Sequence, residues 1–277
     1  VIYRINTTAN TNASINTITA VSDPLFDFQS QSSLNAASVV TVRNSLEVTN
    51  EESFQGSNPF PVADEIKQRA MGVYSMQNRI VTKDDFIAAA YTMPANFGTI
   101  KKVNVLQDTD SFNQRNINLY VISQDTVGKL AKTNNTIKNN LKTYLTRLKM
   151  INDSIDILDA NIINLQISFK IVAFPNINKY SALDSAKQAL ELFFADRKDY
   201  EIGEPFGITD IFTVLKNTPA VLDVVDVDVI VKSGGDYADS NFIANNNKIA
   251  DGRKIFCPLN SVFEIKYPNA DLVGTVI

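Results

Sequence analysis

The chain has 277 residues, 44% of them hydrophobic, and a formal net charge of -4 at pH 7. It contains no histidine and one cysteine, Cys257, which excludes Ser-His-Asp and Cys-His catalysis, the usual zinc sites and an internal disulfide. The acidic balance gives no overall attraction to nucleic acid or to an anionic membrane, and no apolar run approaches the roughly 18 residues of a transmembrane helix. The length is typical of two modest domains, and Cys257 lies in an apolar context that favours a buried, inert thiol.

The first 58 residues predict an extended polar arm and linker. Residues 1–21 alternate Ile with Thr and Asn without a helical period, which is typical of an extended segment or a strand exposed to water. We expect this segment to need a partner for its order. A first α+β subdomain is predicted over residues 59–150, and it begins with a short helix at DEIKQRAMGVYS.

The sequence RIVTKDDF predicts the start of the next helix. The Thr82 hydroxyl can cap the helix, and Asp85, three residues later, can accept a hydrogen bond from the Thr82 amide, which is a capping box. Val81 and Phe86 are spaced to pack as a hydrophobic staple. Arg79 has no role in this scheme, and we expect it to pair with an acid of a packed neighbour.

Two strands and a long helix are predicted next. The segments TIKKVNVLQD and NINLYVIS have the alternation of strands, and apolar residues recur at helical spacing from about residue 126 to residue 149. Basic residues crowd this helix without an acid, which nucleic acid could use. The aromatic residue of this segment, Tyr144, belongs to the apolar stripe and not to the basic face, so a solvated face or a contact with an acidic protein neighbour is favoured, with Lys138 and Lys142 as candidate interface residues.

A second α+β subdomain is predicted over residues 151–277. It contains a half-buried strand at NIINLQISFKIVAF, helices at KYSALDSAKQALELFFADR and GITDIFTVLKN, a strand at AVLDVVDVDVIVK, a long polar loop at 233–254 and an edge strand at SVFEIKY. The predicted fold class is therefore α+β: two α/β sandwich-like subdomains with mixed sheets covered by helices, preceded by an extended N-terminal arm.

Two acidic segments are candidate sites. Asp226 and Asp228 share one face of a predicted strand at a spacing that two catalytic carboxylates or a divalent metal could use. A solvated acidic face explains them equally well, with Val225, Val227, Val229 and Val231 as the core face. The polar loop lacks the spacing of a calcium loop, so we favour a partner contact through Asp236, Tyr237 and Asp239.

Several segments occur in an order that resembles a known family. They are VRNSLEVTNEESFQG, DEIKQRA, RIVTKDDFIAAA and IKKVNVL, followed by IGEPFGITDIFTVLKNTPAVLDVVDVDV, and they span about residues 40–232. In this order they resemble the baseplate J-like family, and the Asn richness and polar insertions are most similar to baseplate wedge proteins of T-even-like contractile-tailed bacteriophages. We expect a carboxy-terminal part of such a protein, since the chain begins at Val1. The motif residues that the resemblance implies to be structural are Arg79, Val81, Thr82, Asp85, Phe86, Gly203, Pro205 and Pro219.

The resemblance implies a structural protein of the virion rather than an enzyme, with no catalytic residues, cofactor or metal. Such a subunit would link wedges into a ring around the tail hub and rearrange when the tail contracts for genome delivery. Its expected partners are a second copy, as a dimer within the ring, other wedge proteins and the hub, with no nucleic acid and no membrane. It would be assembled in the bacterial cytoplasm and reside in the tail baseplate. The alternatives are a baseplate component of a bacterial contractile injection system and a receptor- or carbohydrate-binding module of the tail.

Overall fold

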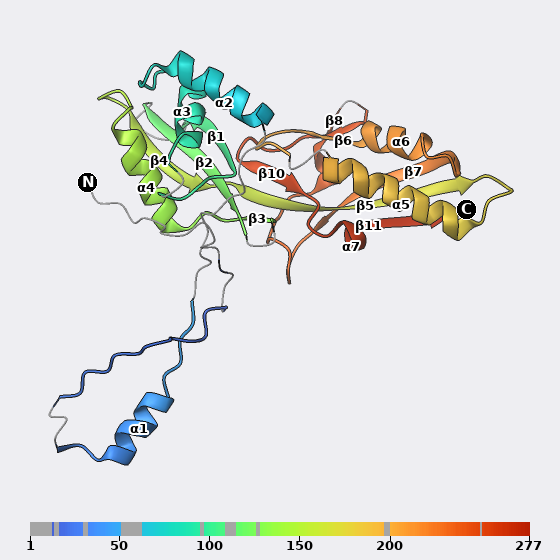
Figure 1. Cartoon of the computed structure of the whole chain (residues 1–277). Coiled ribbons are helices and arrows are strands. Elements are labelled where there is room, and N and C mark those ends of the chain that lie inside the picture. The colour runs from blue at the N-terminus through green and yellow to red at the C-terminus, as the bar shows by residue number, and fades with distance from the viewer. Residues whose placement is uncertain are drawn as a thin grey trace.

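The computed structural model describes residues 13, 17–29, 33–50, 63–94, 97–108, 115–125, 128–196, 200–249 and 251–277. Figure 1 shows a long body in which helices lie against two β-sheets, with residues 17–29 and 33–50 projecting away from it. The predicted α+β class is confirmed. No helix in the described ranges has the length and apolar character needed to cross a membrane.

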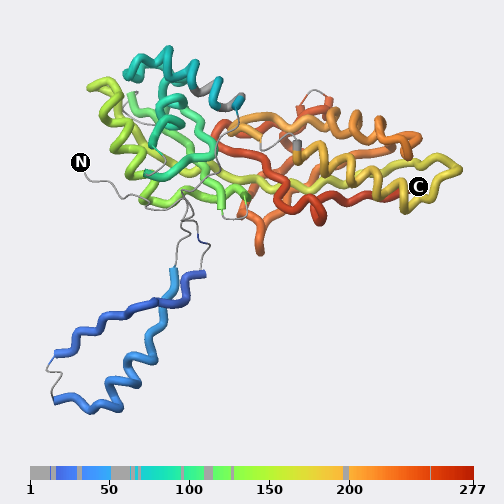
Figure 2. Tube along the Cα trace, in the orientation of Figure 1, coloured from blue at the N-terminus to red at the C-terminus, as the bar shows by residue number. Residues whose placement is uncertain are grey.

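The projecting segment contains a helix that the sequence did not predict, α1 (Ala36–Asn44). The Asn35 side chain caps it by accepting a hydrogen bond from the Ala37 amide at 2.9 Å. Figure 2 traces residues 17–29 outward from the body and residues 33–50 back toward it. The Ile18 amide donates to the Asn50 side chain at 3.0 Å, which joins the two ends of this excursion.

A four-stranded sheet lies in the first half of the body. Its elements are α2 (Ala63–Met76), α3 (Lys83–Tyr91), β1 (Lys102–Gln107), β2 (Asn116–Gln124), β3 (Leu130–Ala131), α4 (Asn135–Thr146) and β4 (Ser154–Asp159). β2 pairs antiparallel with β1 and β3 and parallel with β4. One hydrophobic cluster joins this sheet to α3 and α4, and its fully buried members include Phe86, Leu119 and Leu141.

The helix predicted from about residue 126 to residue 149 is shorter in the structure and begins later. Among the described residues of this range, the α-helix covers Asn135–Thr146. The Asn134 side chain accepts a hydrogen bond from the Thr136 amide at 2.7 Å and thereby caps the helix at this start. Leu130 was predicted on the apolar stripe of this helix. It lies instead in β3, where it pairs with Gln124 of β2. Apolar spacing alone did not reveal this late start.

The second half of the body contains a four-stranded sheet built around β5 (Asn161–Ala173). β7 (Val221–Lys232) pairs antiparallel with β5, and β10 (Ser261–Glu264) and β11 (Leu272–Val276) pair parallel with successive parts of it. α5 (Lys179–Asp196) packs on β11 and β5, and α6 (Ile208–Lys216) packs on β7. Short elements complete this half: β6 (Phe206–Gly207), η3 (Ala244–Asn247), β8 (Lys248–Ile249), β9 (Lys254–Ile255) and α7 (Pro268–Asp271).

The predicted alternation of buried and exposed side chains is confirmed in β5 and only partly confirmed in β7. The five alternate apolar residues predicted on one face of β5 are all buried: Ile163, Leu165, Ile167, Phe169 and Ile171. In β7, Val227 and Val229 are buried, but Val225 is 54% exposed. The register shifts so that Lys170 faces Asp226 while Ile171 faces Val224, which is a β-bulge. The bulge adds one residue to β7 and turns Val224, not Val225, toward the core.

The chain passes from the first sheet to the second at Ala160, between β4 and β5. The two halves are also joined by polar contacts. Lys102 on β1 forms an ion pair with Glu201 at 2.7 Å, and the Asn104 amide group donates to the Leu259 carbonyl at 2.8 Å. The predicted division into subdomains at residues 150 and 151 stays a prediction.

Candidate interaction surfaces

The capping box predicted from RIVTKDDF is present at the start of α3. The Thr82 hydroxyl accepts from the Asp85 amide at 3.2 Å, and the Asp85 carboxylate accepts from the amides of Thr82 at 2.8 Å and Val81 at 3.1 Å. Burial by itself would raise the pKa of Asp85, but these hydrogen bonds outweigh it and the pKa lies below its ordinary value. This part of the motif therefore stabilises a helix terminus.

The other residues of that motif, Val81, Phe86 and Arg79, differ in their burial and in their contacts. Phe86 is buried, whereas Val81 is 56% exposed, and the contact between them that the spacing predicts stays a prediction. Arg79 is exposed, and its charge acts on Asp85 through space. Within the described ranges Arg79 makes no ion pair.

Gly203 lies where the two halves of the body meet. Its φ is +84°, and its amide donates to the Ser261 carbonyl at 2.8 Å. An added Cβ would lie 3.2 Å from Leu259, so both the backbone conformation and the neighbour favour glycine. Pro205 directly precedes β6, and Pro219 lies in the turn between α6 and β7. Their positions are those of turn residues.

The lone cysteine is buried, as the sequence predicted. The Cys257 thiol donates to the Ser261 carbonyl, and burial raises its pKa to about 11. A thiol that is protonated and enclosed in this way is a poor nucleophile. It takes no part in a reactive site.

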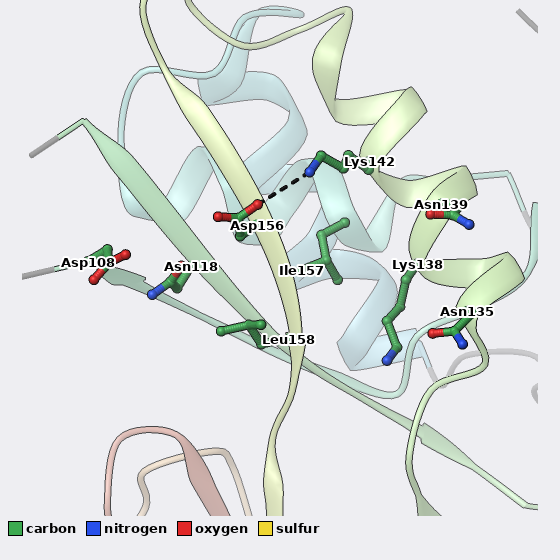
Figure 3. Close-up of a pocket in the computed structure, with 9 residues that line it drawn as sticks. All are labelled: Asp108, Asn118, Asn135, Lys138, Asn139, Lys142, Asp156, Ile157 and Leu158. Atoms are coloured by element: carbon green, nitrogen blue, oxygen red, sulfur yellow. Dashed lines mark hydrogen bonds and ion pairs between the residues drawn. The ribbon is translucent and has the colours of Figure 1, made fainter. Parts of the chain in front are cut away.

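The lysines of α4 face acids of β4 across an open groove of about 440 Å³. Lys138 pairs with Asp159 at 2.8 Å, and Lys142 pairs with Asp156 at 3.3 Å. Figure 3 shows the Lys142 contact, with the lysines on the helix and Asp156 on the strand opposite. The basic stripe thus has internal acidic partners, and these two charges are neutralised within the chain.

Asp226 and Asp228 lie on the face of β7 opposite its buried valines, and Lys248 approaches Asp228 at 3.4 Å. In the part of the chain that the structure describes, no group of three or more Cys, Asp or Glu side chains could hold a metal ion. The arrangement matches the predicted solvated acidic face.

The polar loop after β7 is attached to the body rather than free. The Tyr237 hydroxyl donates to Asp271 at 2.7 Å, and the Ala238 amide donates to the side chain of Asn164 at 2.8 Å. The Asp236 carbonyl accepts from Lys266, whereas Asp239 is exposed. Of the predicted interface residues, Asp236 and Tyr237 are therefore brought together with side chains distant in sequence.

Comparisons with known proteins include a distant likeness to a solved baseplate structure. No protein-family model matches the chain, and no curated protein matches it. Among solved structures, a chain of the anti-feeding prophage (AFP) baseplate, determined by cryo-EM with six-fold symmetry imposed, is 12% identical with a TM-score of 0.47. The match covers 79% of this chain and 44% of the baseplate chain. This chain therefore spans less than half of the length of the baseplate chain.

Proposed function

We propose that this chain is a non-enzymatic, structural component of a contractile-tail baseplate, and more specifically a wedge subunit of the baseplate J-like family. The ordered sequence segments similar to that family support the proposal. Where the structure describes those segments, their distinctive residues build helix caps and turns, as at Thr82, Asp85 and Gly203. A protein whose motifs maintain a fold and present surfaces is suited to assembly rather than to catalysis.

The observation that carries the proposal is the projecting segment of residues 17–50. α1 has nine residues and no buried residue, although isolated helices shorter than about 12 to 15 residues are marginal in water. Val40, Val42 and Leu46 are 54%, 48% and 45% exposed. Burial against another molecule would supply the packing that this helix lacks. A subunit that links neighbours in a ring has a use for such an arm.

The order inside the arm comes from local contacts. The rings of Phe26 and Phe28 stack with centroids 5.9 Å apart, and the Arg43 guanidinium lies 6.0 Å from the centroid of the Phe26 ring. Of these contacts, the ring stack lies within the first limb of the excursion, and the contact of Arg43 with Phe26 joins the two limbs. The exposed apolar residues of the arm remain available to a partner.

The finer parts of the proposal concern the partners. Self-association would use a two-fold patch, and other surfaces would meet other wedge proteins and the tail hub. Contacts of modest strength would allow the ring to re-form in a second geometry when the tail contracts. In this role the chain resides in the virion tail.

The test has two parts. Light scattering on a sizing column, over a range of concentrations, should give a dimer or larger species for the native chain and a smaller mass for V40D/V42D. The matched control is Leu192→Asp on α5, which is 71% exposed in the body and should leave the mass unchanged. An equal effect of both variants, or a monomer at all concentrations, would count against arm-mediated self-association.

Immunogold labelling addresses the baseplate role itself. An antibody raised against this chain should label contractile particles from the source cells at the baseplate end of the tail. Labelling along the sheath, on the head, or nowhere on the particles would contradict the proposal.

A further inference from the structure

We infer that a surface at the junction of the two halves of the body binds an acidic segment of a partner protein. It consists of three lysines and two tyrosines, here called the lysine–tyrosine surface: Lys129, Lys232, Tyr237, Lys266 and Tyr267. These residues come from the segment before β3, the end of β7 with its following loop, and the segment between β10 and α7. The inference stands on this geometry and does not require the baseplate role.

The two tyrosine rings are in contact and the lysines gather around them. The ring centroids of Tyr237 and Tyr267 are 5.8 Å apart in an edge-to-face arrangement. Relative to the Tyr267 centroid, the Nζ atoms of Lys129 and Lys266 lie at 6.0 and 5.8 Å. The Nζ atom of Lys232 lies 5.9 Å from the Tyr237 centroid. Three ammonium groups are thus held by cation–π contacts around one aromatic pair.

The buried carboxylate of Asp271 holds Tyr237 and Tyr267 in place through hydrogen bonds. Asp271 is fully buried and accepts the Tyr237 hydroxyl at 2.7 Å and the Tyr267 amide at 2.8 Å. The hydrogen bond to Asp271, together with burial, raises the pKa of Tyr237 to about 12, so this hydroxyl remains a donor at neutral pH. Lys266 also donates to the Asp236 carbonyl. The surface is therefore preorganised, which lowers the entropic cost of binding.

Within the ranges that the structure describes, the lysine ammonium groups are not paired with a carboxylate, although the charges of Lys129 and Lys266 act through space on the buried Glu264. In contrast to Lys138 and Lys142, none of the three lysines forms an ion pair among the described residues. Glu264 is the other buried acid close by, and its oxygens accept from the Leu130 amide and from Asn164 at 2.8 Å each. Each ammonium group carries three donors, and carboxylates are suitable acceptors for them.

The same geometry favours protein carboxylates over nucleic acid. Single-stranded nucleic acid binds by stacking bases on open aromatic faces. The Tyr267 ring is already approached by two ammonium groups and by Tyr237, and Lys232 lies against Tyr237. Lysine ammonium groups are point charges, so consecutive Asp or Glu side chains could engage them without a fixed planar geometry.

The position of the surface gives the binding a structural consequence. The Leu130 amide, next to Lys129, donates to Glu264 of the second sheet, and β3 itself belongs to the first sheet. An acidic segment bound to Lys129 and to Lys266 would thus contact both halves of the body. It would stabilise their present arrangement, because a ligand favours the conformation that it binds more tightly.

Hexaglutamate labelled with fluorescein is the probe that we would use, with fluorescence anisotropy at low ionic strength and pH 7. The triple variant K129Q/K232Q/K266Q should bind it about tenfold more weakly than the native chain, at roughly 0.5 kcal/mol for each lost pair. The matched control is K170Q/K179Q/K187Q, which removes the same charge from other lysines without ion pairs among the described residues. Its affinity should equal the native value within the error of the titration, so that even a twofold change in the other variants is distinguishable from it.

A second variant covers the case in which the triple variant does not fold, as judged by circular dichroism. Lys232→Gln alone should weaken binding about twofold while leaving the contact between Lys266 and Asp236 in place. Equal weakening by the control triple variant would show an effect of net charge only and overturn the inference. So would undetectable binding of hexaglutamate to the native chain. Tighter binding of an oligothymidylate than of hexaglutamate, with the same dependence on the three lysines, would replace the inference by nucleic-acid binding. None of these outcomes bears on the location of the chain in a tail particle.

Discussion

Gly274 on β11 lies against Phe169 and Leu183 in the hydrophobic core of the second sheet, and its replacement by alanine should destabilise the fold. Gly274 lies opposite Phe169 of β5. An added Cβ would lie 2.4 Å from Cζ of Phe169 and 2.5 Å from Cδ1 of Leu183, where ordinary contacts are 3.4 to 4 Å. The Phe169 ring is fully buried, so it has little room to move away.

The expected magnitude follows from two opposing effects. Overpacking of a well-filled core costs about 1 to 3 kcal/mol. The loss of backbone freedom in the unfolded chain, when glycine becomes alanine, offsets about 0.4 to 1 kcal/mol of this. The net destabilisation should be about 1 to 2 kcal/mol, which lowers the Tm by roughly 2 to 8 °C for a chain of this size.

Thermal and urea unfolding of Gly274→Ala, Phe169→Leu and the double variant would measure this effect. Phe169→Leu alone should be destabilising because it leaves a cavity. In the double variant, the smaller side chain gives the new methyl group space, so the two effects should be less than additive by about 1 kcal/mol. A Tm for Gly274→Ala equal to or above that of the native chain would refute the reasoning, as would strict additivity.

Three further predictions concern hydrogen bonding and ionisation. Thr82→Ala removes the cap of α3 and should cost about 1 kcal/mol in urea unfolding, while Thr82→Ser should restore most of it; equal stability of the two variants would contradict the cap. Because burial raises the pKa of Glu264, the folded state holds this proton more tightly than the unfolded state does, so its contribution to stability should fall as the pH rises from about 4.5 through the raised pKa. Glu264→Gln should lack that slope, and parallel stability curves for the two proteins between about pH 4 and 7 would argue against it. Cys257 should react with a thiol reagent at pH 8 only after unfolding, and rapid reaction of the native chain would mean that the thiol is accessible.

Local patterns in the sequence were sufficient for some elements. The capping box of α3 joins residues three positions apart, so its geometry follows from the helix start itself. The alternation in β5 likewise predicted which of its side chains are buried, since successive side chains of a strand point to opposite faces. The absence of histidine and the lone cysteine excluded whole classes of catalysis before any fold was known.

The remaining features depend on partners distant in the chain. The exposure of Val225 follows from a bulge in the pairing of β7 with β5, which no pattern within β7 reveals. Lys138 and Lys142 formed an isolated basic stripe in the sequence, yet acids of β4 neutralise them. The sequence predicted Tyr237 as an interface residue but not the companions of the lysine–tyrosine surface, because they come from three separate segments.

The sequence by itself therefore determined the cap of α3, the buried face of β5 and the lack of histidine for catalysis, because those depend on neighbouring residues and on composition. Only the tertiary structure decided which charges are neutralised, which strand carries a bulge and which lysines surround Tyr267. Such properties are set by distances across the fold, and a linear pattern does not encode the distance between residues 129 and 267.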